Sequence, residues 1–253
     1  MGRSKDLATG ETRFVNTAGD TMTGNLAINN ASGSQVTLHR SDTTIANDDL
    51  VGQIIMSGDD ADSNASGTRG YIRGRSQGTG GGLKMEFGTA GGGIAMGSDP
   101  RMTINADGYV TMPNQPAFMA QANTTDTLVA NAGSMKVSYG ANPEYNIGSH
   151  FDKTNSRFTA PVAGRYIFHA GYMLQSNLSG FTYRFIVLFK NGASTNSETM
   201  MGDPGSASYA TLTVTYSFDL NANDYIEVYG KQVGGSNATI RQGYKYFTGH
   251  LIG

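Results

Sequence analysis

Alternation of apolar and polar residues in the second half of the chain is the feature that most constrains the fold. It recurs in five runs, at residues 166–174, 181–189, 210–218, 225–229 and 247–252. Successive side chains of a strand point to opposite faces, so this period fits strands that cover a core. Turn-forming residues separate the runs at 190–192, 203–205 and 234–235. The pattern predicts an all-β sandwich or jelly roll.

The run at 181–189 differs from the others because it is apolar on both faces. Phe181, Phe185 and Phe189 share one parity, while Ile186 and Leu188 have the other. A strand that is apolar on both sides is typical of burial on both sides. We therefore expect this strand to lie between a core and an interface.

Residues 25–112 have shorter apolar patches, at 83–87, 102–104 and 109–112, separated by loops predicted at 57–67, 75–82 and 88–93. Glycine, which costs more backbone entropy than other residues, is abundant, with 35 in 253 residues. One chain with so few apolar residues would struggle to offset that entropy. Three copies packed about an axis would bury the single apolar face of each strand, so we expect a trimeric shaft or collar.

The expected organisation has three parts. Residues 1–24 are polar and are interpreted as an attachment segment or linker. Residues 25–112 form the Gly-rich β shaft or collar, and residues 113–253 form the sandwich. Pro113 and Pro116 mark the second boundary, because proline interrupts strand pairing.

Charge and composition exclude several functional classes. The 18 Lys and Arg are balanced by 20 Asp and Glu, so no nucleic-acid partner is expected. The chain has no Cys, which excludes disulfides and thiolate metal sites. The longest apolar run, 185–189, is too short for a membrane span, so no membrane insertion is expected. Residues 1–10 lack the apolar core of a signal peptide, so we expect synthesis in a cytoplasm without classical export.

An acidic loop begins like a calcium-binding loop but does not continue as one. Asp59, Asp60 and Asp62 are clustered, yet Ala65 and Tyr71 stand where the pattern needs Gly and Glu. No metal is assigned, and the three aspartates remain weak candidates for a cation site. The four histidines, His39, His150, His169 and His250, have no ligand spacing and are expected to be packing or interface residues.

Signals for catalysis are weak. Residues 74–78 read Gly-Arg-Ser-Gln-Gly, but no helix is expected after Ser76, as a nucleophile elbow requires. No pair of carboxylates is marked as a hydrolase dyad. The chain is therefore predicted to be a non-enzyme with no cofactor, with a hydrolase kept as a remote alternative.

Residues 113–253 resemble the C1q/TNF-like family. The matching segments are Phe151-Asp152, 157–168, Lys190-Asn191-Gly192, 220–228 and 247–252. The resemblance implies a ten-stranded jelly roll that forms tight trimers, with an aromatic core and an apolar threefold axis.

Residues 19–112 resemble bacteriophage tail-fibre sequences. The similar segments are 19–26, 52–59, 71–74, 82–87 and 101–110. Together the two resemblances imply a homotrimeric virion appendage. Residues 1–24 would attach it to other tail or baseplate proteins, and the C-terminal part would bind a glycan or protein on the host surface.

Loops of the C-terminal part supply the candidate receptor contacts, because function often lies on loops over a rigid scaffold. The candidate residues are Gln175, Asn177, Asn196, Asp203, Tyr209, Lys231 and Asn237. Two other interpretations stay open: a structural virion component without a receptor, and a secreted C1q-like lectin or cytokine-type protein.

Overall fold

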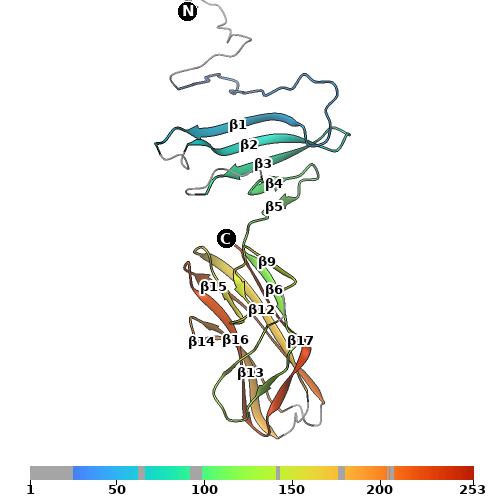
Figure 1. Cartoon of the computed structure of the whole chain (residues 1–253), viewed down its shortest axis with the longest axis vertical. Helices are drawn as coiled ribbons and strands as arrows, with labels where there is room; N and C mark the ends of the chain where they lie inside the picture. The colour runs from blue at the N-terminus through green and yellow to red at the C-terminus, as the bar shows by residue number, and fades with distance from the viewer. Residues whose placement is uncertain are drawn as a thin grey trace, which may run out of the picture.

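The computed structural model describes residues 25–61, 66–91, 99–140, 143–175, 180–203, 205 and 208–253. These residues form strands, turns and loops in two sheet assemblies, one above the other in Figure 1. Within the described ranges, no helix is long and apolar enough to cross a membrane. Because the regular elements of the described residues are all strands, the all-β fold class is confirmed.

The first assembly is one antiparallel sheet, here called the collar sheet. Its strands are β1 (Leu50–Gly58), β2 (Gly67–Gln77), β3 (Gly82–Thr89), β4 (Met102–Ile104) and β5 (Val110–Thr111), paired in sequence order. Our prediction of a loop at 75–82 was partly wrong, because β2 continues through Gln77. Arg75 pairs with Lys84 and Ser76 with Leu83, so this polar segment is part of the sheet.

The two faces of the collar sheet differ in chemistry, because residues paired directly across strands share a face. The large side chains of one face, here called the apolar face, are Ile54, Met56, Ile72, Leu83, Met85, Phe87, Met102, Ile104 and Val110. The opposite, polar face has Gln53, Arg73, Glu86, Thr103 and Thr111 in one row across all five strands.

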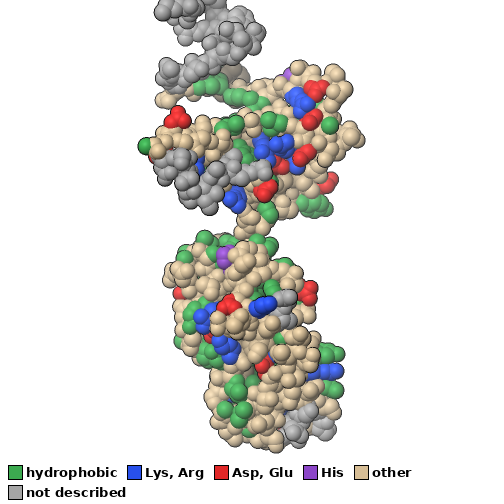
Figure 2. Space-filling model, in the orientation of Figure 1, with side chains coloured by type: hydrophobic (Ala, Val, Ile, Leu, Met, Phe, Trp, Pro, Cys, Tyr) green, Lys and Arg blue, Asp and Glu red, His purple; other side chains and the backbone are tan. Residues whose placement is uncertain are grey.

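Ion pairs hold the polar face together. Arg73 Nε donates to Glu86 Oε2 at 2.6 Å, and Lys84 Nζ lies 3.1 Å from Glu86 Oε1. Burial raises the pKa of Glu86, but the hydrogen bonds from Arg73 and Lys84 outweigh it, so the pKa lies below its ordinary value. Figure 2 shows basic and acidic side chains gathered over this sheet.

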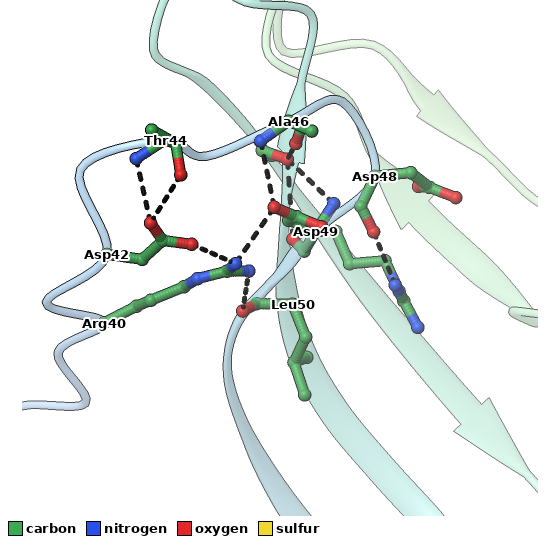
Figure 3. Close-up of polar contacts among 9 residues, drawn as sticks. Arg40, Asp42, Thr44, Ala46, Asp48, Asp49 and Leu50 are labelled. Carbon is green, nitrogen blue, oxygen red and sulfur yellow. Dashed lines mark hydrogen bonds and ion pairs between the residues drawn. The ribbon is translucent and has the colours of Figure 1, made fainter.

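The segment before β1 is fixed to the sheet by polar contacts (Figure 3). Arg40 Nη1 donates to the carbonyl of Leu50 at 3.0 Å, and its Nη2 lies 3.0 Å from Asp49 Oδ2. Ser76 N donates to the Asp49 carbonyl at 2.9 Å, and the Ser76 hydroxyl donates to the Ala46 carbonyl. This polar clamp positions the start of β1 against the end of β2.

The second assembly, here called the head, is a sandwich of two six-stranded sheets. One sheet pairs β10 (Phe151–Asp152), β11 (Arg157–Thr159), β16 (Tyr225–Gly234), β13 (Phe181–Lys190) and β14 (Ala193–Met201) in that order, with β8 (Met135–Lys136) beside β16. The other pairs β15 (Tyr209–Leu220), β12 (Gly164–Gln175), β17 (Ala238–Leu251), β6 (Ala117–Gln121) and β9 (Tyr145–Ile147), with β7 (Asp126–Leu128) beside β17. The expected jelly roll for residues 113–253 is confirmed. Short strands beyond the ten of the resemblance flank the two main sheets.

An aromatic cluster fills the head between its sheets. The Phe118 ring lies 4.8 Å from that of Phe151 and 5.0 Å from that of Phe158, both stacked, and meets Phe247 edge-on at 4.9 Å. Phe168 packs at 5.5 Å from Phe158. These contacts join strands from both sheets, so the core fixes the sandwich.

The strand predicted to be apolar on both faces is β13. Ile186 and Leu188 point into the core and are fully buried. On the outward face Phe185 and Phe189 are half-buried, and the Phe189 ring stacks on that of Tyr229 at 3.9 Å. The core side of the prediction is confirmed, whereas the interface on the outward side stays a prediction. The domain bounds at residues 24 and 112 also stay predictions.

Candidate binding site

Strand pairing brings the predicted contact loops to one end of the head. Gln175, at the end of β12, lies opposite Tyr209 of β15 and Thr239 of β17, and Phe181 lies opposite Gly234. Ala117, where the chain enters the head, pairs instead with His250 at the far end of β17. The ends of β12 and β14 and the turn between β16 and β17 therefore lie at the end of the head away from the collar sheet, here called the distal end (Figure 1).

A bulge in β17 gives the distal end its shape. Tyr172 pairs with Lys245 and Leu174 with Ile240, so β17 holds three more residues than β12 between these two pairs. Gly243 has a φ of 74°, a left-handed conformation that favours glycine. The extra residues bend out of the regular strand pairing near Tyr209. A bulge of this kind changes the direction in which its side chains point.

The bulge completes a cluster of Tyr209, Arg241 and Tyr244, here called the Tyr–Arg–Tyr cluster. The Arg241 guanidinium carbon lies 4.2 Å from the Tyr244 ring centre and 5.3 Å from that of Tyr209. Both tyrosines are half exposed: 49% of Tyr244 and 54% of Tyr209 is accessible to solvent. Attraction between the cation and the two rings holds the cluster in place.

This arrangement suits recognition of polar molecules. The tyrosines offer flat ring faces and hydroxyls, and such amphipathic, rigid side chains are common in binding surfaces. Arg241 adds donors that match carboxylates and hydroxyl pairs. Gln175 pairs with Tyr209 and supplies a neighbouring amide. The cluster can therefore bind a glycan or a polar protein surface.

Two other predicted contact residues help to build the distal end. Asp203 Oδ2 accepts from Gly180 N at 2.7 Å, and its Oδ1 accepts from Gly205 N at 2.8 Å. Asn237 Oδ1 accepts from Ala130 N at 3.0 Å. Their side chains thus position loops, and their part in receptor contact stays a prediction.

Lys231 and Asn196, two further predicted contact residues, do not join the cluster. Lys231 lies on β16 and faces outward, with Nζ 5.8 Å from the Phe185 ring centre. Asn196 is exposed on the edge strand β14, between pairs formed by Ser194 and Glu198. Asn177 lies outside the described residues.

Sequence reasoning missed Arg241 and Tyr244. Both lie in the longest strand, which we expected only from residue 247 onwards. The available signal was Gly243, a glycine within a run of strand-forming residues, which is typical of a bulge. Which strand lies opposite such a bulge depends on pairing between distant segments, and the local sequence does not show this pairing.

The structure does not support the other two candidates, the acidic loop as a cation site and Ser76 as a nucleophile. Asp62 lies outside the described residues, and the described part of the chain contains no group of three His, Cys, Asp or Glu placed to hold a metal ion. The backbone N–H of Asp60 donates to Ser66 Oγ at 2.8 Å. Ser76 lies within β2 and is buried, not at a strand-to-helix turn.

Comparison with known proteins assigns the head to a family. The C1q domain family matches residues 117–252, which is more than half of the chain. Similar solved structures include the globular domain of zebrafish complement 1qA protein, with 16% identity over 55% of this chain and 98% of that one, at a TM-score of 0.37. Eiger TNF from S. frugiperda has 11% identity over 55% of this chain and 94% of that one, at a TM-score of 0.42. Murine APRIL has 10% identity over 55% of this chain and 99% of that one, also at a TM-score of 0.42.

No curated protein matches the chain in sequence. The match spans the head from the first residue of β6 to the residue after β17. The chain therefore belongs to the C1q domain family.

Proposed function

We propose that the chain is a homotrimeric bacteriophage tail-fibre protein whose head binds a receptor on the host-cell surface. The carrying observation is the exposed Tyr–Arg–Tyr cluster at the distal end, opposite the point where the chain enters the head. A fibre must present its receptor site away from its attachment, and this geometry meets that need. Membership of the C1q family supports the trimer and the binding role.

The virion setting of this proposal rests on the resemblance of residues 19–112 to tail-fibre sequences. In this setting residues 1–24 attach the fibre to tail or baseplate proteins, and the protein is made in the host cytoplasm. Three clusters on one trimer engage repeated surface groups together. Linked sites raise the effective concentration, so weak single contacts give firm adhesion.

The experiment is binding of the fluorescent full-length chain to a panel of bacterial strains and isolated surface glycans. We expect saturable binding to a few strains, and the variants Arg241→Ala and Tyr244→Ala should weaken it at least about tenfold, as for interface hot spots. Tyr145→Ala is the matched control, because Tyr145 is exposed to a similar degree, 47%, on the same sheet but away from the cluster.

Each outcome discriminates between roles. Equal loss in all three variants would mean a general defect, and unchanged binding by Tyr244→Ala would place the receptor site elsewhere. A folded trimer that binds no strain or glycan would favour a purely structural virion component.

A C1q-like binding protein that acts outside a virion is the second candidate, because the C1q match favours it equally. Mass spectrometry of purified phage particles separates the two. A fibre protein should be present in a fixed ratio to other tail proteins, whereas its absence from particles would favour the second candidate.

A further inference from the structure

Among the described residues, nothing covers the centre of the apolar face of the collar sheet. Among the described residues up to Met112, Tyr71 is the one hydrophobic residue that is buried, and it lies on the polar face. The rows through Ile72, Phe87 and Met102 are at most half-buried. A sheet needs one apolar face covered for stability, and the described part of the chain does not form a second layer over this sheet.

Residues 25–49, the described segment before β1, do not supply that layer. Leu38 packs at Gly52 of the edge strand β1, where a Cβ atom would lie 2.8 Å from Leu38 Cβ. Leu38 is itself half exposed, and Val36 and Leu26 are exposed. The described part of the segment thus adds apolar surface at the edge strand β1, and Figure 1 shows its backbone beyond β1, on the side away from β2.

We infer that the apolar faces of three collar sheets pack against one another about a common axis, forming a second interface of the trimer. The inference rests on the homotrimer of the proposed function. β5 ends at Thr111 and β6 begins at Ala117, so the connection spans at most about 20 Å. Three associated heads therefore hold three collar sheets within reach, at an effective concentration in the millimolar range.

Charge decides which face turns inward. The apolar face carries no charged side chain, so three copies meet there without repulsion. The polar face carries Arg73, Arg75 and Lys84 on each chain, and its ion pairs line an open cavity of about 410 Å³. Bringing three such faces together would desolvate these charges, which is costly. With the apolar faces inward, the polar face stays turned to solvent and its ion pairs are not desolvated further.

Adjacent residues of β4 provide a matched test. Met102 lies on the apolar face and Thr103 on the polar face. The chain has no Cys, so Met102→Cys and Thr103→Cys each create a unique thiol in the full-length protein. Each variant is treated with a short flexible bis-maleimide and examined on a denaturing gel, while native mass spectrometry records the oligomer. We expect a trimer in both variants and at least fivefold more covalent dimer from Met102→Cys.

Equal yields from the two thiols, or a higher yield from Thr103→Cys, in a trimeric protein would overturn the second interface and leave the proposed function standing. A monomeric wild-type chain would overturn the trimer and the second interface together.

Discussion

At the scale of single residues, Gly249 shows how tightly the head core is packed. A Cβ atom at this position would lie 2.4 Å from Cδ1 of Phe168 and 3.0 Å from the Ile167 carbonyl oxygen. Phe168 packs against Phe158 and Phe247 and has no room to retreat. The glycine is thus required by close approach and not by backbone conformation.

Gly249→Ala should destabilise the head by about 1–3 kcal/mol, because overpacking forces side chains from their preferred rotamers. Urea unfolding followed by tyrosine fluorescence measures the loss. Gly133→Ala is the control, since a Cβ there meets nothing within 4 Å. Equal stability of the two variants would contradict the close packing described here.

Among the described residues of the head, Glu227 is the carboxylate that is buried. Arg157 donates to its Oε1 from Nε at 2.9 Å and Nη2 at 2.8 Å, and Lys136 Nζ lies 2.9 Å from the same atom. Burial raises the pKa of Glu227, but the hydrogen bonds from Lys136 and Arg157 outweigh it, and the pKa lies below its ordinary value. A depressed pKa stabilises the fold above the unfolded-state value and loses that contribution as the pH falls through the folded-state value.

Glu227→Gln should therefore lower the free energy of unfolding at pH 7 by about 1–3 kcal/mol. The difference from wild type should shrink as the pH falls below the unfolded-state pKa of about 4.3. Urea titrations at pH 7 and pH 3.5 measure both effects. Asp219→Asn, which removes an exposed partner of Arg165, should change stability little at either pH. A difference that grows on acidification would refute this account of Glu227.

At the scale of strands and turns, the local sequence predicted those strands and turns that depend on neighbouring residues alone. Alternation identified β12, β13 and β15, because one face of each strand covers the core. The turn at Asn191-Gly192 was likewise predicted, and both residues have positive φ, at 53° and 77°. The polar end of β2 and the bulge of β17 were missed, since pairing with distant strands sets them.

Gly192→Ala should lower stability by about 1 kcal/mol, because an L side chain is strained at positive φ. Gly202→Ala, at a position without positive φ and with open space around it, is the control. Thermal unfolding of the two variants compares them directly. A melting temperature for Gly192→Ala as high as that of the control would mean that the turn relaxes without cost.

At the scale of the whole molecule, the sequence predicted the jelly roll but not the arrangement of the candidate binding site. Tyr209 and Gln175 were candidates as loop residues, and pairing brought them together. Arg241 and Tyr244 joined them through a bulge that only the folded sheet reveals. Lys231 and Asn196 share loop-like sequence but lie elsewhere on the head.

The collar sheet offers a stability test based on two neighbouring residues. Ile54 and Ile55 are exposed to similar degrees in a single chain, 54% and 47%, but lie on opposite faces. If the apolar faces pack together, Ile54→Thr should lower the melting temperature of the collar by several degrees and Ile55→Thr should not. Calorimetry of the full-length trimer measures the difference. Equal shifts in the two variants would show that the two faces are alike in the assembled protein.

The short connection between β5 and β6 has a consequence for evolution. One strand ends at Thr111 and the next begins at Ala117, and between them the chain passes once from collar to head. A single recombination event in the few codons of this connection would exchange an entire head while leaving the collar intact. Lineages that carry this collar could thus acquire a head with a different surface in one genetic step, without rebuilding the assembly that carries the head.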